Sequence, residues 1–177
     1  MTRLENLTLA RKFAAEVMED MRLNFERDGH LAPVAFVVAA VDPKTGKHLQ
    51  HPQTIVVPLD LRDAQKKEES ARELRELAHQ TRAVLVLTGL ESRVSMFAVP
   101  AGASPTARPA MPPMPQRTEV VCVTLEHRNA TTTWFAKISR DGLGKPTIGK
   151  FELQDLVDLG GVFGDFLPRE GAAAMLH

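Results

Sequence analysis

Two histidines and an aspartate are the side chains of this sequence best suited to bind a metal ion. His48, His51 and Asp60 offer two imidazoles and a carboxylate within one short segment. Imidazole nitrogens and carboxylate oxygens are ligands of Zn²⁺ in proteins. Histidines on a polar hairpin arm are more often simply exposed to solvent. The three residues are therefore metal candidates only, and we predict no bound metal and no cofactor.

The run His48–Pro52 and the aspartate after it resemble the His-x-His-Pro motif and downstream aspartate of JAMM-type metalloproteases. In this sequence two residues separate the histidines instead of one. No serine precedes Asp60 at the expected distance, and no upstream glutamate stands out as a general base. The resemblance leaves a metal-dependent hydrolase as an alternative to a non-catalytic role.

Three charged residues flank the two ends of a proline-rich segment. Glu91 precedes it, and Arg117 and Glu119 follow it. These side chains meet in space if the strands before and after the segment are neighbours. We expect a salt-bridged clamp on the loop, with a functional site as the alternative.

The sequence around these charges also follows a recurring pattern. The segments Ala83–Val86, Leu90–Ser92 and Pro115–Glu126 resemble small bacterial and phage α+β proteins of unknown function. In those proteins a strand leads to a glutamate, a proline-containing loop follows, and a Pro-x-Arg-x-Glu run begins the next strand. The resemblance implies no activity, and it directs attention to the same charged residues.

Two further motifs have simpler structural interpretations. Cys122, His127 and Asn129 are the residue types of a thiol protease. On one strand, however, a separation of five residues puts the cysteine and histidine on opposite faces, about 16 Å apart along the axis. We predict an inert core cysteine. The run Gly142–Lys145 lacks the spacing of a phosphate-binding loop and precedes a proline, so we predict a hairpin turn.

The segment 99–117 carries half of the chain's 12 prolines. Because proline fixes φ and lacks an amide donor, this segment cannot form helix interior or central strand. We predict an extended Pro/Ala-rich loop. Its Pro109-x-x-Pro112 and Pro112-x-x-Pro115 runs match ligands of SH3-like grooves, and an inert insertion is the other reading. Trp134, the only tryptophan, is predicted to fill the core.

Composition limits the class of protein. The 177 residues carry 22 basic and 22 acidic side chains, so no net field attracts nucleic acid or acidic membranes. No window is apolar enough to span a bilayer, and the first residues do not form a signal peptide. One cysteine cannot form an internal disulfide. We therefore expect a cytoplasmic protein with no nucleic-acid or membrane partner.

The first half of the chain alternates helix and strand patterns. Apolar residues at steps of three and four predict a helix from about Leu4 to Arg27, closed at Gly29. The continuous run Val34–Val41 predicts a strand buried on both faces. A turn then leads to a pairing strand at Ile55–Val57, and Asp60 is the expected N-cap of a helix running to about Gln80.

The second half is rich in strands. We predict strands at Arg82–Leu90, Glu119–Glu126, Thr131–Arg140 and Thr147–Phe151. Leu153, Leu156 and Val157 predict a short final helix, followed by an apolar stretch containing Phe163, Phe166 and Leu167 that docks on the body. The result is one α+β domain over residues 1–177, with order α-β-β-α-β-β-β-(β)-α. It has one mixed or mainly antiparallel sheet of five to six strands and two main helices on one face.

These features favour a non-catalytic protein that acts through protein–protein contacts. The long helix and the apolar tail carry more apolar surface than one thin sheet covers, which favours a homo-oligomer or contact with another protein. The alternative is a small-molecule or metal-dependent hydrolase. Its site would lie between the 48–60 hairpin and the 91–119 loop.

Overall fold

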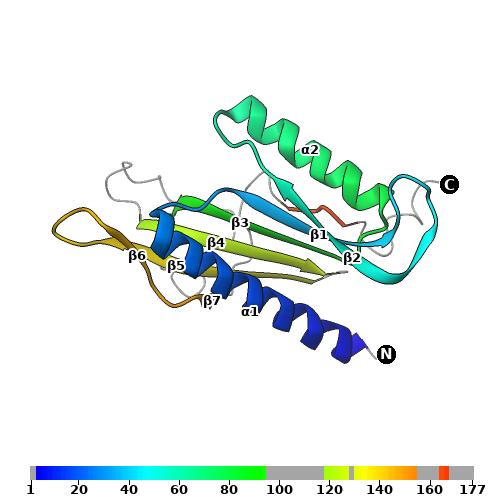
Figure 1. Ribbon diagram of the computed structural model, residues 1–177, viewed down its shortest axis with the longest axis horizontal. Helices are drawn as coiled ribbons and strands as arrows, with labels where there is room; N and C mark the ends of the chain where they lie inside the picture. The colour runs from blue at the N-terminus through cyan, green and yellow to red at the C-terminus, as the bar shows by residue number, and fades with distance from the viewer. Residues whose placement is uncertain (1–2, 95–117, 128–129, 155–163, 168–177) are drawn as a thin grey trace, which may run out of the picture.

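The computed structural model describes residues 3–94, 118–127, 130–154 and 164–167 (Figure 1). Within these residues, two helices accompany one antiparallel sheet of seven strands in the order β2-β1-β3-β4-β5-β6, with β7 also paired to β5. The α+β class is confirmed, and the sheet has more strands than predicted. The elements are α1 (Arg3–Asp28), β1 (Val34–Val41), β2 (His48–Pro58), α2 (Ala64–Gln80), β3 (Leu85–Val94), β4 (Thr118–His127), β5 (Ala130–Arg140), β6 (Pro146–Ile148) and β7 (Glu152–Gln154).

The long first helix forms as its periodicity predicts. Its apolar stripe, which includes Ala14, Met21 and Phe25, is buried against β3, β4 and β5. The helix ends at Asp28, where Gly29 takes a φ of 75° and its N–H donates to the carbonyl of Phe25. Glycine adopts this left-handed conformation without the steric penalty of a Cβ, which explains why the helix stops there.

The β1–β2 hairpin is also confirmed. Asp42 accepts a hydrogen bond from the backbone N–H of Lys44, and Gly46 takes a positive φ in the turn. The ladder runs regularly from the pair Val34–Pro58 to Ala39–Gln53. β2 begins at His48, well before the apolar run Ile55–Val57 from which it was predicted, because its first half is polar and exposed.

The N-cap of α2 was predicted one turn too early. The cap is Asp63, whose side chain accepts from the N–H of Lys66 at 2.8 Å. Asp60 instead forms an ion pair with Arg62, and its backbone N–H donates to the hydroxyl of Ser70. Both aspartates lie in the polar loop before α2. Asp63 is the cap because its side chain accepts from an N–H in the first turn of the helix.

The prediction that both helices pack on one face is wrong. Leu85 and Leu87 of β3 lie in the cluster under α1, whereas Val86 between them lies in the cluster under α2. Successive strand side chains point to opposite faces, so the helices cover opposite sides of the sheet (Figure 1). The prediction that β1 is buried on both faces holds only in part: Ala35 and Val37 are buried under α2, whereas the residues that alternate with them are half-buried.

The C-terminal elements differ in part from the prediction. Leu153 lies in strand β7, paired with Trp134, and not in a helix. Leu156, Val157 and Phe163 lie outside the described residues, as does the segment 99–117. Phe166 and Leu167 do dock as predicted, since both are buried in the cluster under α2.

The remaining core prediction concerns Trp134. It shares the α1 side of β5 with Ala136 and Ile138 and packs, partly buried, against that core. No helix in the described part of the chain is long and apolar enough to cross a membrane.

Candidate functional site

The structure does not bring the metal candidates together. His48 opens β2 and lies beside Arg82, 3.3 Å from its guanidinium, whereas Asp60 follows the far end of the same strand. A strand rises about 3.3 Å per residue, so these two side chains lie more than about 20 Å apart. His51 is exposed on the same strand. Among the described residues, no three histidine, cysteine or acidic side chains are placed to hold a metal ion.

Two residues of the expected charged cluster, Glu91 and Glu119, make separate contacts. Glu91 accepts a hydrogen bond from the backbone N–H of Leu31, next to the end of α1. Glu119 lies between two guanidiniums, 2.9 Å from Arg93 and 3.1 Å from Arg140. These hydrogen bonds lower the pKa of Glu119. Arg117 lies outside the described residues.

Glu119 therefore ties together three adjacent strands, β3, β4 and β5. Its partners are Arg93 and Arg140, not Glu91 or Arg117, so the clamp expected from the sequence stays a prediction. The glycine run Gly142–Lys145 likewise forms the turn between β5 and β6, with the Asp141 carboxylate accepting from the N–H groups of Leu143 and Lys145.

Cys122 lies half-buried on the α2 side of β4. Its Sγ is 3.8 Å from the hydroxyl of Thr124, and desolvation raises the pKa of the thiol to about 11. His127 is an odd number of residues away on the same strand and so faces the other side of the sheet. The two side chains cannot form a nucleophile–base pair.

We expect Cys122 to be nearly inert in the folded protein. The thiolate is the nucleophile, and a pKa of about 11 leaves roughly one thiol in a thousand ionised at pH 8. A disulfide reagent such as Ellman's should label the native protein about 100-fold more slowly than the urea-unfolded chain. Equal labelling rates in the two states would contradict the burial of this thiol.

A buried carboxylate that the sequence analysis missed is Glu126, with 6% of its surface exposed. Its two oxygens accept from the backbone N–H groups of Phe166 and Leu167, each at 2.9 Å. Arg75 of α2 stacks over the Phe166 ring at 5.7 Å. Glu126 thus holds residues 166–167 against the sheet beside α2.

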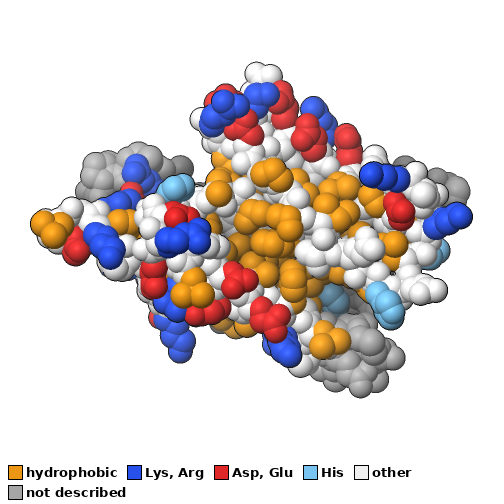
Figure 2. Space-filling view, in the orientation of Figure 1, with side chains coloured by type: hydrophobic (Ala, Val, Ile, Leu, Met, Phe, Trp, Pro, Cys, Tyr) orange, Lys and Arg blue, Asp and Glu red, His pale blue; other side chains and the backbone are white. Residues whose placement is uncertain are grey.

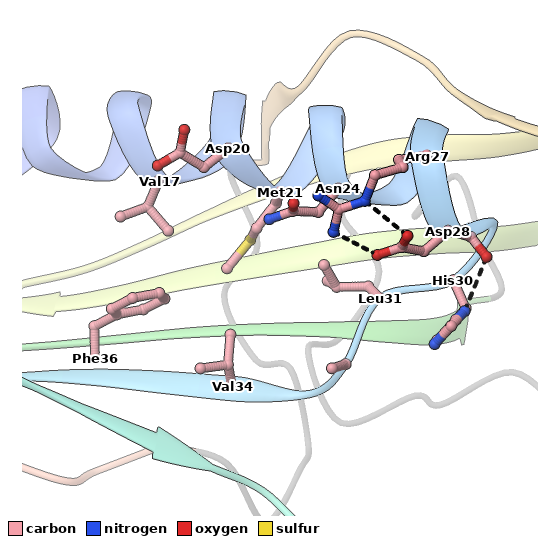
Figure 3. Close-up of a pocket in the computed structure, with 11 residues that line it drawn as sticks. Val17, Asp20, Met21, Asn24, Arg27, Asp28, His30, Leu31, Val34 and Phe36 are labelled. Atoms are coloured by element: carbon pink, nitrogen blue, oxygen red, sulfur yellow. Dashed lines mark hydrogen bonds and ion pairs between the residues drawn. The ribbon is translucent and has the colours of Figure 1, made fainter.

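A pocket of about 390 Å³ lies between the C-terminal half of α1 and the start of β1 (Figure 3). Val17 and Met21 of the helix face Val34 and Phe36 of the strand across it. At its end, the Arg27 guanidinium pairs with Asp28, and His30 Nδ1 lies 3.0 Å from the Asp28 carbonyl. The polar groups at the end of this apolar pocket are exposed, and the salt bridge there is formed between two residues of the protein itself.

The pocket continues into an apolar surface that we call the open face. It arises because α1 lies chiefly over β3, β4 and β6, so that no described helix fully covers the same side of β1 and β2. Val56 is 59% exposed and Leu9 54% exposed, and the Phe13 ring packs edge-on against Phe36 at 6.2 Å. Figure 2 shows apolar side chains gathered there, between the charged groups of the two helices. The residues of the open face are Leu9, Phe13, Val34, Phe36, Val38 and Val56.

Comparisons with known proteins add no assignment. The chain matches no protein-family model, no curated protein and no solved structure. The resemblance to small bacterial and phage proteins thus stays a prediction.

Proposed function

We propose that this chain is a non-catalytic binding protein that acts by associating with a second copy of itself through the open face. The observation that supports this most directly is the exposure of Val56 beside the half-buried side chains of Val34, Phe36 and Val38. A contiguous apolar surface with a polar rim is typical of a protein–protein contact. A partner that covers it gains the free energy of burying that surface.

The charge balance supports a second copy as the partner. The chain has equal numbers of acidic and basic side chains, so two copies do not repel one another through net charge. The charged side chains flank the open face on α1 and α2 instead of lying within it. The expected cytoplasmic location and the lack of nucleic-acid partners stay predictions from composition.

The hydrolase alternative lacks such support. Its site required His48 and Glu91 to share a cleft, but β1 separates them. His48 pairs with Val41 at one end of this strand, and Glu91 contacts Leu31 before its other end. No observation on the described residues favours that alternative over association.

Light scattering across a range of concentrations tests the proposal. We expect the wild-type mass to approach that of a dimer as concentration rises through the micromolar range, and Val56→Lys to shift the equilibrium toward monomer, since it places a charge on the open face. Leu143→Lys is the matched control, because Leu143 is 96% exposed on the β5–β6 turn away from this face. A wild-type monomer at every concentration would overturn the proposal.

A further inference from the structure

Within the described part of the chain, no strand pairs with the outer edge of β2. The N–H of Leu59 donates to the carbonyl of Pro33, so the backbone carbonyl of Pro33 points toward β2. The N–H of Val84 donates to the carbonyl of Val38, so the backbone carbonyl of Val38 points toward β3. Along a strand, the N–H and C=O of one residue point toward one neighbouring strand, and those of the next residue point toward the opposite side. Through the regular β1–β2 ladder, Gln53, Ile55 and Val57 therefore bond β1, while Thr54 and Val56 point away from the sheet.

Both of these outward residues are exposed, and no other described strand pairs with β2 on that side. Proteins usually protect such an edge with charged side chains, particularly lysine. None of the 11 residues of β2 is lysine, arginine, aspartate or glutamate. The edge therefore lacks the charges that prevent pairing with another strand.

Two prolines bound this free edge. Pro52 and Pro58 fall at outward-facing positions of β2, where the missing N–H costs no bond to β1. Between them, Thr54 and Val56 are the two residues with both an outward donor and an outward acceptor. The edge thus offers a short pairing segment with a defined beginning and end.

We infer that two copies join by antiparallel pairing of their β2 edges around a twofold axis at Ile55. This inference rests on the proposed self-association and places the contact at the β2 border of the open face, beside Val56, instead of over the whole of that face. In this register Thr54 of one copy faces Val56 of the other, and each such pair exchanges two hydrogen bonds. Pro52 then faces Pro58 of the second copy, so no donor is left without an acceptor.

A second copy fits this edge because its own β2 carries the same two-residue pairing segment between prolines. A register shifted by two residues would set Pro52 opposite Val56 or Pro58 opposite Thr54, so the residue opposite the proline would make one hydrogen bond in place of two. A twofold contact uses the same edge on both copies, so it closes as a dimer and cannot extend into a fibre. The open faces of the two copies then continue across one sheet.

The test compares two substitutions at one position. Thr54→Pro removes an outward N–H but keeps every β1–β2 bond, whereas Thr54→Val keeps the N–H and serves as the control. We expect the dimer dissociation constant of Thr54→Pro to rise about 10- to 100-fold, because each dimer loses two hydrogen bonds, and that of Thr54→Val to stay near the wild-type value. Circular dichroism verifies that both variants fold.

A second variant reports the register and does not depend on proline. Ile55→Cys in a Cys122→Ser background places two thiols across the axis, at a Cα separation within disulfide range. We expect a disulfide-linked dimer on a non-reducing gel. If Thr54→Pro dimerises like the wild type, or if Ile55→Cys fails to cross-link a dimer, the edge-pairing inference is wrong. A dimer that Val56→Lys dissociates but Thr54→Pro does not would keep the open face as the contact and overturn edge pairing, whereas a wild-type monomer at every concentration overturns the proposed function.

Discussion

Replacement of Glu126 by alanine is expected to lower the free energy of unfolding by about 2–5 kcal/mol. The side chain is buried, and it is the acceptor for the N–H groups of both Phe166 and Leu167. Removing it leaves two buried donors unpaired, each of which costs its full desolvation penalty. Urea unfolding followed by Trp134 fluorescence measures the loss. Faster hydrogen exchange at the two amides would show that residues 166–167 have detached.

Glu119 on the same strand is the matched control for this prediction. Its two partners are exposed arginines, so Glu119→Gln should cost no more than about 1 kcal/mol at neutral pH. Its folded-state pKa is lowered from 4.5, so its contribution is present above that value and is lost as the pH falls through the lowered pKa. Wild type and Glu119→Gln should therefore converge in stability in acid. Equal costs for the two glutamate replacements at neutral pH would contradict the distinction.

Gly89→Ala is expected to destabilise the protein by about 1–3 kcal/mol, and Gly89→Val by more. A Cβ at Gly89 would lie 2.1 Å from Cε and 2.7 Å from Sδ of Met21, which packs down onto β3 from α1. Met21 is buried but also lines the pocket between α1 and β1, so the end of its side chain must turn toward that pocket and lose its contacts on β3 to admit the methyl group. Thermal unfolding measures the effect.

A double-mutant cycle tests the stated cause. Met21→Ala alone should cost about 2–5 kcal/mol, and the combination with Gly89→Ala should cost less than the sum, because the added methyl group then enters vacated space. Gly142→Ala is the control, since nothing lies within 4 Å of the added atom. Strictly additive effects at Gly89 and Met21 would indicate another origin for the destabilisation.

Local periodicity predicted most elements of this fold but not their placement. The stripe of α1 and the continuous run of β1 appear in the sequence because α1 is buried along one side, and β1 is buried on its α2 side and half-buried on the other. The side of the sheet that each helix covers depends on which residues of β3 and β4 pack against it. The periodicity of a helix does not contain that information, because it depends on how the strands pair. The strand around Leu153 was missed because three residues carry too short a pattern to separate strand from helix.

The functional features were harder to predict because they depend on contacts between residues that are far apart in the chain. Glu126 and its partners are about 40 residues apart in the chain, and no spacing rule connects them. The histidines were close in sequence, yet an extended strand separates them from Asp60. The free edge of β2 could have been suspected from the lack of charge between His48 and Pro58. That lack becomes informative only when β2 is known to end the sheet.

The distance in sequence between Glu126 and Phe166 also has a consequence during translation. Ribosomes add about 5–20 residues per second, so the intervening 40 residues take about 2–8 s to synthesise. During that interval the nascent sheet displays an apolar surface beside α2 that Phe166 and Leu167 have not yet covered. Until then Glu126 has neither of the two backbone donors that it binds in the folded protein, so water must solvate its carboxylate in their place.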